Sequence, residues 1–367
     1  MFSRFTRLLN RRSPGIGLEI TPERLNIAQL TAQGYRYKLT KFAKLSIPEG
    51  MFVEGRINDP PALAAIIQDL LYEHNITAKQ VATAVPLQAT IIRTLPVPAE
   101  LDDQELRDIV LNYEAALNLP YPRETVDLDY QKLGVFEDVD GIEKVQILLV
   151  AIRKEVTDSY LDTLQQAGLA LEVLDVNSFA LIRTVREHLR TFGSEEAVVL
   201  INIEFDRTEI SIIVNGVPHF SRTVTIGMLQ MQQALALAMD LPPSRDPEIL
   251  QGIAIPVTQF ERFDSPAATV NPGIAALMQV LGELADELQR SLDFYLNESQ
   301  GVEVVQLLLA GPGGGLVQLD EYFSQTLNIP TIKVDPLESL MIETEQSFSS
   351  IERPSLATVL GLGLRII

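Results

Sequence analysis

Alternating apolar and polar residues open the chain and predict a meander of short strands at 15–20, 25–31 and 35–47. Asp59 and two prolines then precede apolar residues at helical spacing, which predicts an amphipathic helix. The apolar residues of this helix are Leu63, Ile66, Ile67, Leu70 and Leu71. A further strand is expected at 80–86.

Residues 88–170 have a pattern of their own and predict a small inserted α+β subdomain. A strand comes first, a helix begins at Asp102, two strands flank an acidic turn at 137–141, and a second helix ends at Gly168. Glycine is a good residue to end a helix. The order strand, helix, strand, strand, helix suits a compact unit of this size.

The second half of the chain restarts the same order of elements. The expected strands lie at 169–176, 197–206, 208–214, 217–226 and 302–310. A loop is expected at 242–272 and a long amphipathic helix at about 273–298. The last strand is followed by a glycine-rich turn at 311–315 and by a helix that carries Leu316 and Phe323.

Two hairpins half a chain apart resemble each other. Residues 16–28 align with 201–213, so that Glu19 matches Glu204, and each copy is a strand, a polar turn and a strand. The match suggests a duplicated α/β fold with a cleft between its halves. Short alternating strands often look alike, so two unrelated hairpins remain the alternative.

The glycine-rich turn adds to this pattern. It follows a buried strand and places Gly311, Gly313 and Gly314 where a backbone can approach a ligand closely. Two hairpins and such a turn, in this order, resemble the actin-like ATPase superfamily, and within it the PilM family of type IV pilus assembly proteins. The resemblance covers nearly all of residues 14–367, and LLLAGPGGGLVQLDEYFSQTLNIP is its most specific stretch.

The resemblance implies an α/β fold of the actin-like ATPase type, with two duplicated halves around a cleft and a small inserted α+β subdomain. The expected units are a basic N-terminal segment at 1–13, a first half at 14–87 plus 171–196, the inserted subdomain at 88–170, and a second half at 197–367.

The phosphate loops depart from the family pattern. The family's first loop resembles G-I-D-I-G-S-S-S. In the alignment, Gly17 stands where the family has the aspartate, and Glu19 stands where it has the second glycine. The second loop usually reads D-I-G-x-x-x-T, and here Asn202 replaces the acid and Glu204 the glycine. A carboxylate beside a phosphate is repulsive, and loss of the acid weakens Mg²⁺ binding.

We therefore expect no catalytic residue, no metal site, negligible hydrolysis and at most weak binding of ATP or ADP. Arg24 and Arg207 lie near these loops, either to neutralise part of the negative charge or as ordinary surface charges. The expected nucleotide contacts are Gly311, Gly313, Gly314, Thr21 and Thr208.

The resemblance implies a cytoplasmic scaffold that binds the N-terminal cytoplasmic peptide of the membrane protein PilN, in a groove beside the inserted subdomain. It would link the inner-membrane assembly platform to other pilus assembly and motor proteins. The alternative is an ATP-binding switch or slow ATPase whose nucleotide state controls partner binding. A division-type filament protein like FtsA and a carbohydrate kinase are disfavoured.

Amino-acid composition excludes several kinds of partner and site. With 29 basic and 49 acidic residues, the net charge is −20, which disfavours nucleic acid as a partner. The absence of cysteine excludes disulfides and thiolate metal sites, and no apolar run is long enough to cross a bilayer. Residues 1–12 form one basic, amphipathic segment, which is either a peripheral membrane contact or a solvated tail.

Overall fold

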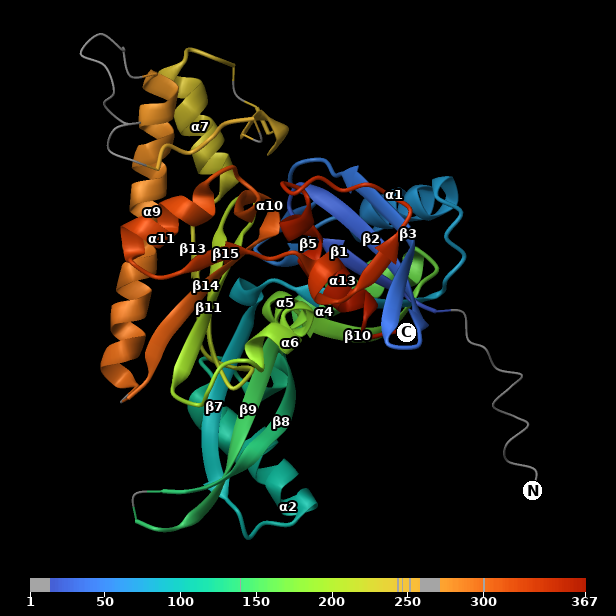
Figure 1. Cartoon of the computed structure of the whole chain (residues 1–367). Helices are drawn as coiled ribbons and strands as arrows, with labels where there is room; N and C mark the ends of the chain where they lie inside the picture. The colour runs from blue at the N-terminus through green and yellow to red at the C-terminus, as the bar shows by residue number, and fades with distance from the viewer. Residues whose placement is uncertain are drawn as a thin grey trace.

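The computed structural model describes residues 14–138, 140–242, 244–245, 247–250, 252–257, 271–299 and 301–367. Two mixed β-sheets stand side by side in the body of the molecule, and a third sheet forms a lobe below them (Figure 1). The predicted basic segment at 1–13 lies outside the described residues.

The first sheet has six strands. In spatial order they are β10 (Ala170–Val176), β6 (Gln80–Val85), β1 (Ile16–Ile20), β2 (Arg24–Gln33), β3 (Arg36–Ser46) and β16 (Ile342–Thr344). The predicted meander of β1, β2 and β3 is antiparallel, whereas β6 runs parallel to both β1 and β10. Helix α1 (Pro60–Glu73) begins as expected, because the Asp59 side chain accepts a hydrogen bond from the Ala62 N–H.

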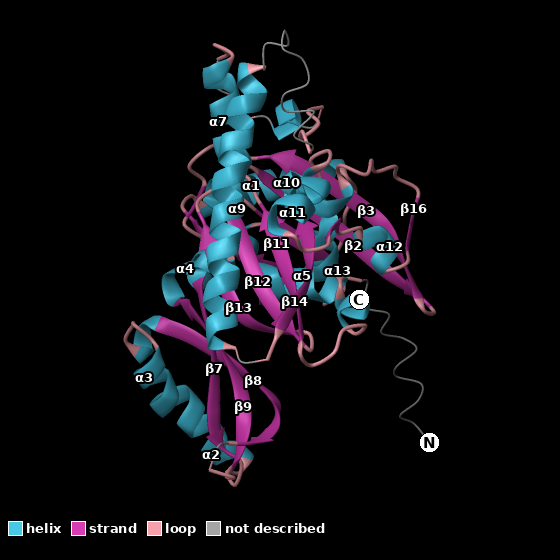
Figure 2. Cartoon of the chain, turned by 60° about the vertical axis from the view of Figure 1, so that its left-hand side comes forward, coloured by secondary structure: helices cyan, strands magenta, loops and turns pink. Residues whose placement is uncertain are grey.

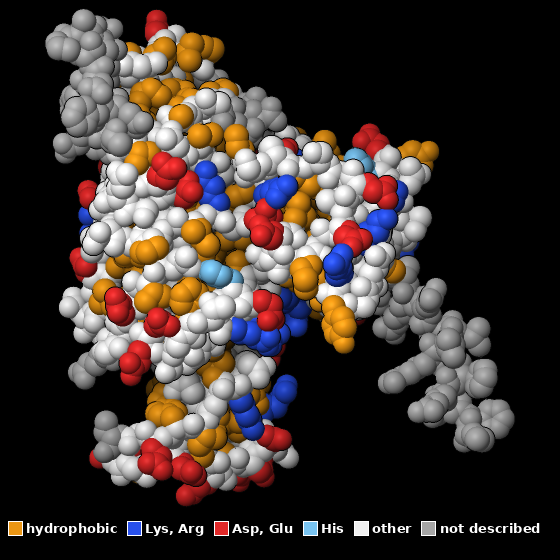
Figure 3. Space-filling model, viewed as in Figure 1, with side chains coloured by type: hydrophobic (Ala, Val, Ile, Leu, Met, Phe, Trp, Pro, Cys, Tyr) orange, Lys and Arg blue, Asp and Glu red, His pale blue; other side chains and the backbone are white. Residues whose placement is uncertain are grey.

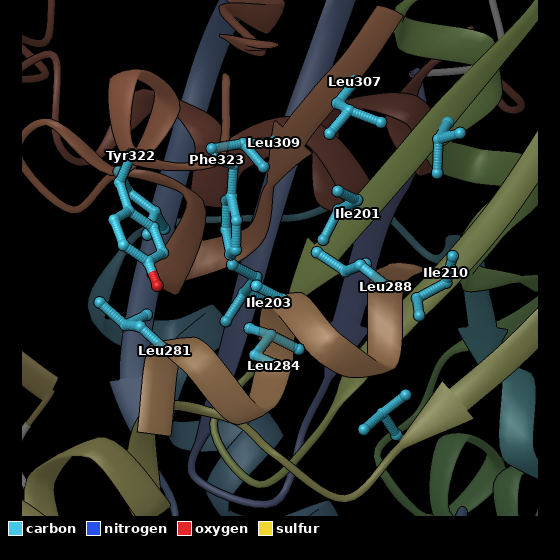
Figure 4. Packing of buried hydrophobic residues seen from close by; sticks show 14 of the residues in the cluster. Ile201, Ile203, Ile210, Leu281, Leu284, Leu288, Leu307, Leu309, Tyr322 and Phe323 are labelled. Atoms are coloured by element: carbon cyan, nitrogen blue, oxygen red, sulfur yellow. The ribbon is translucent and has the colours of Figure 1, made fainter. Parts of the chain in front are cut away.

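The second sheet has five strands. In spatial order they are β13 (Val217–Val224), β12 (Thr208–Val214), β11 (Glu196–Ile203), β14 (Glu303–Ala310) and β15 (Thr331–Lys333). The long helix α9 (Pro272–Glu298) packs one apolar face on this sheet, where Leu281, Leu284 and Leu288 meet the strand side chains (Figure 4). Side chains three and four residues apart lie on one helical face, which is why the sequence period predicts this packing.

The inserted lobe has its own three-stranded sheet (Figure 2) and projects from the body of the molecule (Figure 3), and it has its own hydrophobic core. The strand order is β7 (Thr90–Pro98), β9 (Glu143–Arg153) and β8 (Val126–Glu137), and one side is covered by α2 (Asp103–Asp108), a π-helical turn (Ile109–Glu114) and α3 (Ala115–Asn118). Helix α4 (Lys154–Gln166) packs elsewhere, because Val156 and Tyr160 are buried in the core of the first sheet. This packing favours an inserted unit that ends before Lys154, although the predicted limits of all four units stay predictions.

The other elements connect or cover these sheets. They are β4 (Phe52–Val53), β5 (Arg56–Ile57), α5 (Asn177–Thr184), α6 (Arg186–Leu189), α7 (Met228–Ala238), α10 (Gly311–Gly314), α11 (Leu319–Leu327), α12 (Pro336–Ser339) and α13 (Ala357–Gly363), with 3-10 turns η1 (Leu87–Ala89), η3 (Arg123–Thr125), η4 (Pro247–Leu250) and η5 (Arg353–Leu356). Helix α13 returns to the first sheet and packs on β1, β2 and α5, so the C-terminus lies beside the first half (Figure 1).

One local prediction needs correction, and another is tested only in part. The glycine-rich segment is a short helical turn, α10, and Leu316 precedes the following helix, which begins at Leu319. The predicted loop at 242–272 contains the turn η4, and its residues 258–270 lie outside the described part of the chain.

Candidate functional site

The turns of the two hairpins face each other between the sheets. The hydrogen bonds of each hairpin show which residues of one are equivalent to which residues of the other. In the first turn the Thr21 N–H donates to the Arg24 carbonyl at 3.0 Å, and in the second the Glu204 N–H donates to the Arg207 carbonyl at 2.8 Å. Glu19 lies opposite Asn26 on β2, just as Asn202 lies opposite Glu209 on β12. Thr21 is therefore the counterpart of Glu204.

The internal repeat is present, but the predicted alignment was wrong by two residues. Glu19 matches Asn202, not Glu204, and so stands at the acid position of the loop. Gly17 does not occupy that position: a Cβ there would lie 2.5 Å from the Gly363 N and the Val359 O of α13. Strand side chains alternate with a period of two, so a shift of two residues leaves the apolar pattern unchanged and sequence alone could not detect it.

A buried arginine fills the space between the two turns. The Arg24 Nη2 lies 3.3 Å from Glu204 Oε2 and 3.8 Å from Glu19 Oε1, and its Nη1 donates to Glu23. We call Glu19, Glu23, Arg24 and Glu204 the cleft network. Arg24 is only 4% exposed, so of the two alternatives considered for it, the ordinary surface charge is excluded.

Burial and charge oppose each other within the cleft network. Burial by itself would lower the pKa of Arg24, but the carboxylates of Glu23, Glu204 and Glu19 raise it above its usual value. Burial raises the pKa of Glu19 and of Glu23 to about 7, although Arg24 acts in the opposite direction. The guanidinium is thus the fixed charge of the site, and the carboxyls of Glu19 and Glu23 are the groups whose pKa burial moves toward neutrality.

A fourth buried carboxyl, Glu209, joins the halves beside the network. Its Oε1 accepts a hydrogen bond of 2.7 Å from the Leu87 N–H, which belongs to the first half, and its Oε2 accepts one of 3.4 Å from the Asn202 side chain. Burial raises the pKa of Glu209 to about 7, and the charge of Glu204 acts in the same direction. Sequence reading missed this residue, because a glutamate in an alternating strand looks like a solvent-facing side chain.

The raised pKa of Glu209 predicts a pH-dependent stability. A carboxyl whose pKa is 4.5 when unfolded and about 7 when folded holds its proton more tightly in the folded state, so stability decreases as pH rises between these values. We expect the free energy of unfolding, measured with urea, to be higher near pH 5 than near pH 7.5. Glu209→Gln should remove up to about 3 kcal/mol of this difference. An unchanged pH profile in that variant would contradict the assignment.

The two predicted threonine contacts are occupied by internal hydrogen bonds. The Thr21 hydroxyl donates to the Arg24 carbonyl and accepts from the Arg24 N–H, both at 3.2 Å. The Thr208 hydroxyl donates to the Ile226 carbonyl at 2.7 Å. Thr21 lines the cavity between the turns, and Thr208 begins β12 directly after the second turn. Both hydroxyls thus bond the protein's own backbone.

The predicted glycine contacts are close to protein atoms. A Cβ on Gly311 would lie 2.5 Å from the Asn202 Oδ1, and one on Gly313 would lie 2.3 Å from the Ile203 Cγ2. A Cβ on Gly314 would lie 3.0 Å from the Leu309 carbonyl carbon. These glycines therefore allow α10 to pack on β11 and β14, which is a sufficient reason for their presence.

The cavity between the two turns is small. It measures about 20 Å³ and is lined by residues of both halves, among them Thr21, Pro86, Glu204 and Glu209. A cavity of ~10–15 Å³ on this measure holds one water molecule. In this structure the cavity between the turns therefore has room for little more than one water molecule.

A larger groove lies beside the inserted lobe. It measures about 580 Å³ and is lined by Thr90–Thr94 of β7 on one side and Pro218–Thr223 of β13 on the other, with Phe294 of α9. Both β7 and β13 are edge strands of their sheets. Pro96 and Pro98 block the far end of the β7 edge, whereas the part that lines the groove contains no proline.

Two paired α/β halves around a cleft define the class: the fold is that of the actin-like proteins. The structure is similar to MreB5 of Spiroplasma citri solved with ADP (TM-score 0.50, 12% identity, 89% of this chain and 94% of that one) and to the ethanolamine utilization protein EutJ of Carboxydothermus hydrogenoformans (0.54, 14%, 95% and 89%). The family model "Type IV pilus assembly protein PilM" matches residues 17–247 and 274–367. The chain belongs to the PilM family.

One further solved structure bears on the function. A PilM–PilN type IV pilus biogenesis complex contains a chain that matches with a TM-score of 0.80 and 28% identity, over 96% of this chain and 98% of that one. In the described part of the chain, none of the helices has the length and apolar character that a membrane span requires.

Proposed function

We propose that this protein is a scaffold of the type IV pilus machine that binds the N-terminal cytoplasmic peptide of PilN. The observation that carries the proposal is the match to the chain of the PilM–PilN complex over 96% of the sequence. The scaffold would act at the cytoplasmic face of the inner membrane and connect the assembly platform with motor components.

The cleft supports a role without nucleotide turnover. Arg24 and three carboxylates fill the space between the turns, and the cavity left there is about 20 Å³. A carboxylate such as Glu204 would repel a phosphate group at this position. We therefore favour the scaffold over the ATP-binding switch.

The groove between β7 and β13 is the place we propose for the peptide. An extended peptide can add to a free strand edge through its main chain, and the groove offers two such edges. Arg93 and His219 are exposed there, on a protein whose net charge is −20. The groove thus suits a peptide with an acidic residue and with apolar residues that pack near Phe294.

Calorimetric titration tests the function. We expect a synthetic peptide of the PilN N-terminus to bind the purified protein and Mg-ATP to give no heat of binding. If the peptide does not bind, the scaffold proposal is wrong. If Mg-ATP binds, or if the peptide affinity changes when ATP is added, the ATP-binding switch is favoured instead.

Charge reversal tests the groove separately. Arg93→Glu should weaken peptide binding by roughly tenfold, the effect of about 1.4 kcal/mol. The matched control is Lys79→Glu, since Lys79 is also exposed and does not line the groove. If the peptide binds both variants equally, its binding site lies elsewhere on the protein. The proposed scaffold function would still stand.

A further inference from the structure

The cleft network connects the two halves of the molecule. Arg24 begins β2 in the first half, and Glu204 follows β11 in the second, yet the Arg24 Nη2 and the Glu204 Oε2 are 3.3 Å apart. The other two carboxylates of the network, Glu19 and Glu23, come from the first half. Within this network, the salt bridge between Arg24 and Glu204 is therefore the contact that crosses the cleft.

We propose that the Arg24 guanidinium is the resident cation of the cleft and positions the two halves, replacing the ligand that the two loops hold in actin-like ATPases. This goes beyond the scaffold function, because it assigns the residue that sets the orientation of the halves. It also explains why a phosphate-binding loop can carry Glu204: the carboxylate binds a cation that the chain itself supplies.

Both partners of the link are held in place by their own backbone. The Arg24 N–H donates to the Thr21 hydroxyl, and the Glu204 carbonyl accepts from the Met228 N–H at 3.1 Å. Each side chain thus starts from a turn that is already fixed, so no backbone has to be ordered when the ion pair forms. Burial of both groups also protects the pair from screening by salt.

Two neighbouring contacts also join the two halves across the cleft. One is the buried hydrogen bond from the Leu87 N–H to Glu209, and the other is an exposed ion pair of 2.6 Å between Glu49 and Arg245. A buried charge without a partner costs several kcal/mol, whereas an exposed pair contributes little. Arg24 is consequently the charge on which the closed arrangement depends most.

The distance between spin labels on the two halves tests this inference. The chain has no cysteine, so two introduced cysteines are the only labelling sites. Tyr35→Cys in the first half and Leu237→Cys in the second use side chains that are 96% and 86% exposed. A pair within the first half, Tyr35→Cys with Tyr72→Cys, is the control for an intact fold.

We expect the spin labels at positions 35 and 237, on opposite sides of the cleft, to give one narrow distance distribution. Addition of Mg-ATP should leave this distribution unchanged. Arg24→Met should broaden this distribution and shift it to longer distances, while the pair within the first half stays the same. Glu204→Gln keeps the shape of the side chain but removes its charge, and should give the same shift in a smaller amount.

Two results would overturn the inference. One is a distribution across the cleft that neither Arg24→Met nor Glu204→Gln alters. The other is a wild-type distribution that is already broad and narrows when Mg-ATP is added. If Arg24→Met does not fold, Glu204→Gln alone decides, because it leaves Arg24 with Glu19 and Glu23 as partners.

Discussion

Arg24→Met should lower the free energy of unfolding by about 3–5 kcal/mol, because it removes the only cation from a buried group of three carboxylates. Methionine fills a similar volume, so the loss reports charge more than packing. Urea unfolding at neutral pH, followed by circular dichroism, measures the change.

The matched control for this prediction is Arg222→Met. Arg222 forms an ion pair of 2.7 Å with Glu287, but its side chain is 41% exposed. Exposed pairs contribute about 0–1 kcal/mol, so this variant should be close to the wild type. Similar losses in the two variants would mean that burial gives Arg24 no special importance.

A second large effect is expected at Gly311, one of the residues predicted from sequence to contact a nucleotide. Its φ is +76°, and a Cβ would lie 2.5 Å from the Asn202 Oδ1 and 2.6 Å from the Ile203 carbonyl oxygen. Gly311→Ala should therefore combine backbone strain with a clash and destabilise the protein by about 2–5 kcal/mol. The midpoint of urea unfolding gives the measurement.

Gly216→Ala separates the two causes. Gly216 has nearly the same φ, +74°, but a Cβ there would have no neighbour within 4 Å. Gly216→Ala should lower the free energy of unfolding by about 1–2 kcal/mol, because only the left-handed backbone conformation is unfavourable there. If Gly311→Ala costs no more than this control, Gly311 is not needed for packing, and the nucleotide-contact prediction for it regains support.

The sequence predicted most of the secondary structure because each element has a strong local pattern. The apolar spacing of Leu63, Ile67 and Leu70 identified α1, and Asp59 identified its first residue correctly. The strands of both meanders were expected within a few residues of their observed bounds. Local patterns of this kind depend on side-chain periodicity, which the chain carries without its neighbours.

The candidate site was predicted less completely. Glu19 and Glu204 were singled out from the sequence and both belong to the cleft network, but Glu19 stands at the acid position of its loop and not at the glycine position that the predicted alignment gave it. Of the two threonines, Thr21 lines the cavity between the turns, whereas the Thr208 hydroxyl donates to the Ile226 carbonyl. Their roles were not apparent, because a hydroxyl that could contact a phosphate can equally well bond a carbonyl of its own turn. Gly311 and Gly313 have the same ambiguity, since glycine allows a ligand or a neighbouring strand to approach.

The helices and strands, the internal repeat and the family resemblance are all evident without the structure, because they rest on residues close together along the chain or on whole patterns. The tertiary structure alone decided the register of the repeat and the partners of each charge. Arg24 and Glu204 are 180 residues apart, so nothing local distinguishes a buried guanidinium from a surface one. Only the folding that brings both turns to one cleft removes them from water and makes the pair.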